Sequence, residues 1–165
     1  MPFPKLAEST RVARLESPTS TIHMVIDTDT YNEIDDQFAI AYALLSPERI
    51  VVEAIYAAPF HNDRSTGPGD GMRKSYDEIV RLLGRMNRPH AGFVHTGASE
   101  WMSGPDELVH SPAVDDLIAR AMRHEDEPLY VVAIGAPTNI ASALLLKPEI
   151  SSRIVVVWLG GHATY

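Results

Sequence analysis

The sequence contains no cysteine, and this absence excludes several kinds of chemistry. Disulfide bonds, thiolate nucleophiles and sulfur-ligated zinc sites all need cysteine, so none of them can operate in these 165 residues. The chain also lacks any apolar run that approaches the roughly 18 residues of a membrane-spanning helix. We therefore expect no membrane partner. The lack of cysteine is also compatible with a reducing, cytoplasmic location, which we adopt as the expectation.

Basic residues are scarce as well. The 14 lysines and arginines are outnumbered by 22 aspartates and glutamates, which gives a formal net charge of -8. Binding to the backbone of DNA or RNA depends on clustered basic side chains that release counterions. We therefore expect no nucleic-acid partner. A protein of this charge is better suited to bind a cation or a small neutral molecule.

The order of apolar segments predicts the fold class. Residues 1–21 carry charges and prolines but no apolar core of a signal peptide, so we expect an irregular N-terminal arm. From residue 22 onward, short β-branched runs alternate with helical patterns, which is typical of βαβ units on a parallel sheet. We predict a single α/β domain over residues 22–165, with a Rossmann-like, mostly parallel sheet flanked by helices. The expected buried strands cover residues 22–26, 50–56, 129–134 and 154–159.

The helix expected after the first strand also has a predicted orientation. Apolar residues recur at helical spacing over residues 34–45, so this face should pack on the sheet. Pro47 then ends the helix. The predicted inward face consists of Ile34, Phe38, Ala41, Tyr42 and Leu45.

An acidic run joins the first strand to this helix. Asp27 and Asp29 stand at the carboxyl end of a buried strand, and Asp35 and Asp36 stand in the first turn of the helix. In open α/β sheets this edge is where ligands bind. A helix N-terminus stabilises a nearby negative charge by only about 0.3–1 kcal/mol, which is too little for several converging carboxylates. An all-oxygen cluster of this kind favours a hard cation, with Ca²⁺ first and Mg²⁺ as the alternative.

Helix capping is the competing interpretation of the acidic run. Asn32 has a residue type that often caps helices, and Asp35 stands three residues later, where a capping box places its acid. Capping accounts for one or two acidic residues but not for four. Metal binding is therefore the favoured interpretation.

Three ordered motifs resemble those of the inosine-uridine preferring nucleoside hydrolase family. The first is the strand followed by Asp27-Thr-Asp29, a turn and Asp35-Asp36; the others lie at residues 131–141 and 157–161. The resemblance runs from about residue 24 to 161. One departure is the turn, because Asp35 follows Asp29 by six residues where the commoner family pattern has a tighter turn. The chain resembles the branch of the family that reads Asn-Glu-Ile-Asp-Asp.

The resemblance implies metal-dependent hydrolysis of the N-glycosidic bond of ribonucleosides, which releases free base and ribose. It implies that Ca²⁺ is held by Asp29, Asp36 and the main-chain carbonyl of Ile134, with Asp27 in support. It assigns Asp35 as the base that accepts a proton from the attacking water.

The same resemblance implies the residues that meet the substrate. Asn62 is expected to contact the ribose, and Leu159 is expected to pack under the sugar. Asn32 and Glu33, in the wider turn, are placed on the substrate side. A homo-oligomer, either a dimer or a tetramer, is also expected. In the family, further ligands come from a C-terminal part beyond the third motif, so we expect this chain to hold only part of the catalytic domain.

Two other functions stay open from the sequence. Ile26-Asp-Thr-Asp-Thr30 also matches the first motif of haloacid-dehalogenase-like phosphatases, in which Asp27 would be the nucleophile and Asp29 the acid–base, with Mg²⁺. Release of phosphate rather than free base would identify that activity. The second alternative is a non-catalytic fragment that binds a metal or a protein partner.

Overall fold

A five-stranded parallel sheet forms the centre of the computed structural model, which describes residues 3–161. Its strand order is β3-β2-β1-β4-β5. The predicted Rossmann-like α/β fold is therefore confirmed. The strands are β1 (Ile22–Thr28), β2 (Ile50–Ala57), β3 (Val94–Thr96), β4 (Leu129–Ala133) and β5 (Ile154–Trp158).

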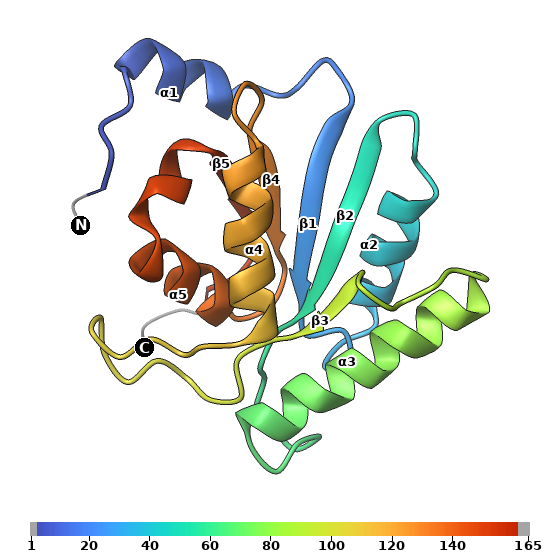
Figure 1. Cartoon of the computed structure of the whole chain (residues 1–165). Helices are drawn as coiled ribbons and strands as arrows, with labels where there is room; N and C mark the ends of the chain where they lie inside the picture. The colour runs from blue at the N-terminus through green and yellow to red at the C-terminus, as the bar shows by residue number, and fades with distance from the viewer. Residues whose placement is uncertain (1–2, 162–165) are drawn as a thin grey trace.

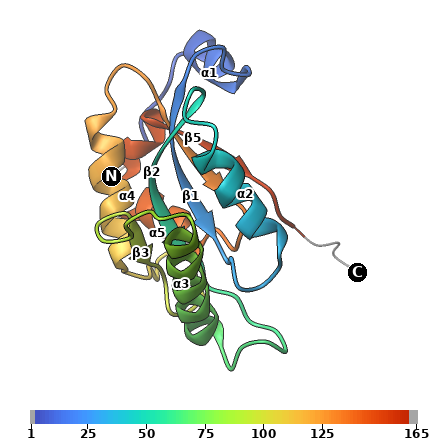
Figure 2. The same cartoon turned by 90° about the vertical axis from the view of Figure 1, so that its right-hand side faces the viewer.

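Helices cover both faces of the sheet. Figure 1 shows α4 and α5 on one side and α2 and α3 on the other, and Figure 2 shows α2 and α4 on opposite sides of β1 and β2. Among the described residues, no helix combines the length and apolar character that crossing a membrane requires. The helices that cover the sheet are α2 (Asp35–Leu44), α3 (Pro68–Arg85), α4 (Pro112–Arg123) and α5 (Thr138–Leu146), and a short 3-10 helix follows at Pro148–Ser152.

Alternation along β1 feeds two separate cores. Successive side chains of a strand point to opposite faces of the sheet. Val25 packs on one face with Leu117 of α4 and Ile140 of α5. Ile26 packs on the other face with Ile40 of α2 and with side chains of α3. The central strand is thus buried on both sides, which is why it reads as a continuous apolar run.

The predicted orientation of α2 is wrong. Ile34, Phe38, Tyr42 and Leu45 are 69–72% exposed, and Ala41 is only half-buried. The face that packs on the sheet is instead the one that carries Asp36 and Ile40, followed one turn later by Ala43 and Leu44. Residues at i, i+4, i+7 and i+8 share one side of a helix. Burying Asp36 at the sheet edge therefore turns the opposite apolar stripe toward solvent.

The N-terminal segment also differs from the prediction of an irregular arm. Residues Glu8–Leu15 form helix α1, none of whose residues is buried. Arg11 binds Glu8 one turn earlier, which supports a helix locally. The Arg14 guanidinium donates to the Ser152 carbonyl and so attaches α1 to the end of the sheet away from the acidic run. Packing on the core therefore does not explain this helix, because it lies on the surface.

The strand order places one crevice at the centre of the sheet. From β1 the chain proceeds to β2 and β3 on one side, and later to β4 and β5 on the other (Figure 1). The loops that follow β1 and β4 therefore diverge above two adjacent strands. In open α/β sheets this topological switch point is where ligands bind.

The orientation of α2 can be tested by two matched substitutions. Ile40→Ala removes a fully buried side chain and should lower the free energy of unfolding by about 2–5 kcal/mol. Phe38→Ala removes a side chain that is 69% exposed and should change it by less than about 0.5 kcal/mol. Urea unfolding followed by circular dichroism measures both. A larger loss for Phe38→Ala than for Ile40→Ala would contradict the observed packing.

Candidate active site

A cavity of about 720 Å³ opens at the carboxyl edge of the sheet, at the switch point. Segments that follow all five strands contribute to its lining, because the carboxyl ends of parallel strands meet at one edge of the sheet. The lining residues are Asp29, Asn32, Glu33, Asp35, Asp36, Pro59, Phe60, His61, Asn62, Trp101, Ile134, Gly135, Ala136, Pro137, Trp158, Leu159, Gly160 and Gly161.

The structure brings together all but one of the site residues expected from the sequence. Asp27 is the exception, because it is fully buried and does not line the cavity. Phe60 and Trp158 line the cavity without having been expected. Apolar strand-end residues of this kind have no sequence signal that separates them from the core. The roles of the lining residues stay predictions; those that line it as expected are Asp29, Asn32, Glu33, Asp35, Asp36, Asn62, Ile134 and Leu159.

Asp27 is held by a buried amide rather than by solvent. Asn139 donates from Nδ2 to Asp27 Oδ2 at 2.8 Å, while Asn139 Oδ1 accepts from the backbone N–H of Ala98 at 2.8 Å. The other oxygen, Asp27 Oδ1, has no hydrogen-bond partner among residues 3–161. Burial raises the pKa of Asp27 from 3.8 to about 7, although the bond from Asn139 opposes this. A carboxylate enclosed in this way is not accessible as a phosphatase nucleophile.

Asp36 is the second buried carboxylate of the run. It lies in the first turn of α2, and its Oδ1 accepts a 2.5 Å hydrogen bond from the Thr28 hydroxyl, which also contacts Thr30 at 2.8 Å. Burial raises the pKa of Asp36 to about 7; the Thr28 bond lowers it, and the neighbouring charges of Asp29 and Asp35 raise it further. Thr28, the last residue of β1, thus holds this carboxylate at the cavity that it lines.

A chain of amide hydrogen bonds connects two loops to Asp29. Asn62 donates from Nδ2 to Asn32 Oδ1 at 2.6 Å, and Asn32 donates from Nδ2 to Asp29 Oδ2 at 3.0 Å. Burial is the main cause that raises the pKa of Asp29. The competing interpretation, in which Asn32 caps the helix, is wrong, because the N-cap of α2 is Ile34 and no side chain caps it. The wider turn therefore serves the cavity instead of the helix end.

The loop after β4 approaches these carboxylates with its backbone. The N–H of Ile134 donates to the Asp27 carbonyl at 2.9 Å. A Cβ atom on Gly135 would lie 2.9 Å from the Asp29 nitrogen and 3.1 Å from Asp29 Oδ1. Only a residue without a side chain fits this approach. The glycine therefore lets main-chain atoms of this loop come close to Asp29.

These residues fit a hard divalent cation. None of the salt bridges among residues 3–161 involves Asp27, Asp29 or Asp36, although burial disfavours their charges. Carboxylate and carbonyl oxygens are the donors that Ca²⁺ and Mg²⁺ prefer. Two carboxylates and one carbonyl are fewer than the roughly six to eight oxygens that Ca²⁺ takes. The remaining ligands would have to be water, substrate hydroxyls or groups outside this chain.

Comparison with known proteins identifies the family. Residues 24–165 match the family described as inosine-uridine preferring nucleoside hydrolase. The chain belongs to this family. It is 29% identical over 161 residues to the pyrimidine-specific ribonucleoside hydrolase RihA of Klebsiella pneumoniae (strain 342), covering 84% of this chain and 48% of RihA. It is 30% identical over 162 residues to the non-specific ribonucleoside hydrolase RihC of Salmonella agona (strain SL483), covering 88% of this chain and 50% of RihC.

This member of the nucleoside hydrolase family spans about half the length of those two curated relatives. A solved structure supports the same fold: the type III effector protein XopQ complexed with adenosine diphosphate ribose. It superposes with a TM-score of 0.60 at 18% identity, over 98% of this chain and 52% of XopQ. At that identity the likeness concerns the fold alone. The family match gives no support to the phosphatase alternative.

The buried carboxylates make the stability of the cation-free chain depend on pH. Because the pKa values of Asp27 and Asp36 are raised to about 7, the folded chain binds more protons than the unfolded chain between about pH 4 and pH 7. Their contribution is therefore favourable at low pH and is lost as pH rises through about 7. In chelator at about pH 8, Asp36→Asn should be more stable than the unsubstituted chain by about 1–3 kcal/mol. At about pH 4 that advantage should be absent.

Urea unfolding at several pH values measures this difference. Asp115→Asn is the matched control, because Asp115 is exposed on α4 and far from the acidic run in the sequence. It should change the pH profile little. An Asp36→Asn variant that is less stable than the unsubstituted chain at pH 8 would contradict the assignment of a buried, uncompensated charge.

Proposed function

We propose that this chain supplies the metal-binding and ribose-binding part of a nucleoside hydrolase, which cleaves the N-glycosidic bond of ribonucleosides to free base and ribose. The observation that carries the proposal is the cavity at the switch point, where Asp29, Asp35 and Asp36 face one space. Family membership and two relatives named as ribonucleoside hydrolases support the substrate class.

The cation in this proposal is Ca²⁺, held by Asp29, Asp36 and the carbonyl of Ile134. Asp27 acts in support from beneath, through its uncompensated oxygen and its bond to Asn139. Mg²⁺ is the less suitable alternative, because it demands near-ideal octahedral geometry. When bound, a divalent cation lowers the pKa of its water and orients the sugar hydroxyls.

Asp35 is the proposed base. It is exposed at the first position of α2, next to Asp36 in the chain, so its carboxylate is free to receive a proton from water in the cavity. Cleavage of the glycosidic bond develops an oxocarbenium-like cation on the sugar. Nearby carboxylates therefore stabilise the transition state more than the ground state.

The sugar and the base occupy the rest of the cavity in this proposal. Asn62 is positioned for ribose by its bond to Asn32, and Glu33 offers a further acceptor for hydroxyl groups. Leu159 supplies an apolar surface under the sugar. Aromatic side chains at the rim, such as Trp158, suit the planar base. The base preference is not fixed by this set, and the two relatives named above differ in it.

We infer in addition a cytoplasmic homo-oligomer, either a dimer or a tetramer. The exposed stripe on α2, formed by Ile34, Phe38, Tyr42 and Leu45, supports association, because contiguous apolar surface of this kind commonly lies in an interface. The lack of cysteine suits a reducing compartment.

Asp35→Asn separates the base from the metal ligands. The turnover of the variant should fall by about 10²-fold or more. Turnover is measured with the intact protein as the free base released from inosine or uridine. Its Ca²⁺ affinity, measured by calorimetry on the chain, should change little. Asp29→Asn and Asp36→Asn should instead weaken Ca²⁺ binding directly.

Asp115→Asn is again the matched control for loss of one charge, since Asp115 lies on the exposed side of α4. Near-normal turnover by Asp35→Asn would reject Asp35 as the base. Unchanged Ca²⁺ affinity in both Asp29→Asn and Asp36→Asn would reject the proposed metal site. Release of phosphate from phosphate esters, without release of base from nucleosides, would reject the proposed function itself.

A further inference from the structure

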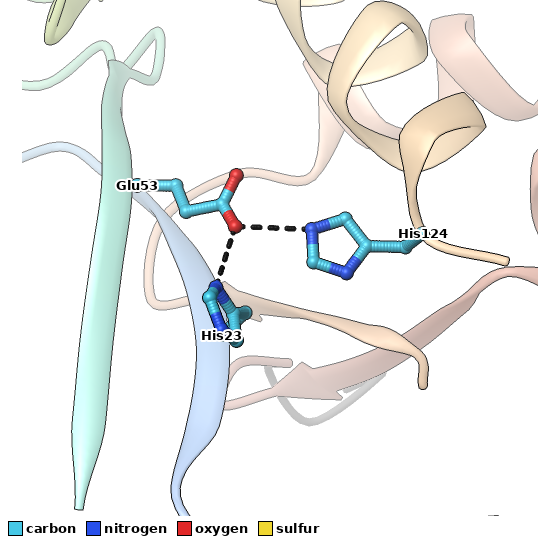
Figure 3. Close-up of side chains that lie close together, drawn as sticks. All are labelled: His23, Glu53 and His124. Carbon is cyan, nitrogen blue, oxygen red and sulfur yellow. Dashed lines mark hydrogen bonds and ion pairs between the residues drawn. The ribbon is translucent and has the colours of Figure 1, made fainter. Parts of the chain in front are cut away.

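A second polar cluster lies on the α4 face of the sheet, away from the cavity. His23 of β1, Glu53 of β2 and His124 at the end of α4 place one ligand atom each within 4.8 Å of one another. Figure 3 shows both imidazole rings turned toward the same carboxylate oxygen. That oxygen, Glu53 Oε1, lies 2.8 Å from His23 Nδ1 and 3.0 Å from His124 Nε2. Among the described residues this is the one group of three histidine or acidic side chains whose ligand atoms lie so close together.

A β-bulge turns Glu53 toward this cluster. Met24 pairs with Val52 and Val25 pairs with Ala54, so Glu53 is the extra residue of the bulged strand. Bulges re-aim side chains and are common beside functional sites. Without the extra residue, the regular alternation of β2 would not direct both Glu53 and Ala54 to the α4 face. The local fold thus brings a carboxylate to a position between two histidines.

His124 completes the cluster from a helix end. It is the C-cap of α4, where the carbonyl ends of the helix favour a nearby positive charge. The His124 side chain is 15% exposed and that of Glu53 is 16% exposed, whereas His23 is 45% exposed. Two ligands are therefore held in place by packing, and the third faces solvent. An ion could enter from the His23 side.

The charges around the cluster leave one carboxylate oxygen for the histidines. Arg120 contacts the other oxygen, Glu53 Oε2, at 3.4 Å, but its stronger partner is Asp116 at 2.6 Å. Arg153 donates to the His124 carbonyl rather than contacting its ring. The charge of Arg120 is thus largely matched by Asp116. Glu53 Oε1 therefore faces the two imidazoles alone.

We propose that His23, Glu53 and His124 form a binding site for a first-row divalent metal ion such as Zn²⁺. Two imidazoles and one carboxylate are a ligand set that zinc uses, with a fourth position left for water. Ligands about 2.0–2.1 Å from a tetrahedral zinc ion lie about 3.3 Å apart, so the two measured contacts need to widen by only a few tenths of an ångström. Imidazole nitrogen favours such ions over the hard cation proposed for the cavity.

The site would join three elements that are far apart in the sequence. Its ligands come from the first strand, the second strand and the fourth helix, so the ion would clip α4 to the sheet. A metal that binds the folded chain alone stabilises it by mass action. The cluster stands six residues before Asp29 along β1, which is about 20 Å at the rise of a strand. The two sites can therefore be tested independently.

The test is Zn²⁺ binding to the chelator-treated chain, measured by calorimetry with Ca²⁺ present in excess to occupy the acidic cavity. The expected result is one zinc site, a higher melting temperature, and shifts of the His23 and His124 ring signals in nitrogen-detected NMR spectra. His23→Ala should weaken Zn²⁺ binding at least about a hundredfold, since changes outside the ligand shell already cost about 10–100-fold. This substitution removes an exposed side chain and so does not endanger folding. Glu53→Gln keeps the shape and should also weaken Zn²⁺.

His90→Ala is the matched control, because His90 is exposed and outside the cluster. Equal zinc affinity in His23→Ala, Glu53→Gln and the unsubstituted chain would overturn the proposal. Zinc binding lost in Asp29→Asn but kept in His23→Ala would also overturn it, because the ion would then occupy the acidic cavity. The zinc measurement does not depend on nucleoside hydrolysis, so a failed hydrolase assay would reject the proposed function without rejecting the zinc site.

Discussion

The hydrogen bond from the Asn139 amide to Asp27 connects the strand ends on which the cavity is built. Asn139 lies in the first turn of α5, after β4, and its amide nitrogen donates to Asp27 of β1. The amide oxygen of the same side chain accepts from the backbone N–H of Ala98, after β3. The packing around it is close enough that a Cβ on Gly97 would lie 2.4 Å from Asn139 Nδ2. One buried side chain thus fixes three segments that are distant in the sequence. The positions of the loops that follow these three segments therefore depend on this contact.

That arrangement concentrates negative charge where water is largely excluded. Burial raises the pKa values of Asp27, Asp29 and Asp36, and no basic side chain among residues 3–161 forms a salt bridge with them. A folded chain holds such a cluster either protonated or around a cation. The same electrostatic cost would favour the binding of a divalent cation, as proposed above. In this account, metal binding and the stability of the strand ends are coupled.

The sequence predicts those parts of the fold that have a periodic signal. Buried strands can be predicted because their β-branched runs are bounded by turn residues. The orientation of α2 was not predictable from apolar spacing, because the helix carries two stripes and the burial of Asp36 selects the less obvious one. The acidic run located the cavity. The contact between Asn62 and Asn32 depends on tertiary structure, and so does the bulge that presents Glu53.

The central claim is that the acidic run is a calcium site at the switch point. A crystal structure of the chain grown with Ca²⁺ tests it most directly. The account predicts one ion with oxygen atoms of Asp29 and Asp36 and the Ile134 carbonyl at about 2.3–2.6 Å. Calcium absent at saturating concentration, or bound without contact to Asp29 and Asp36, would contradict it.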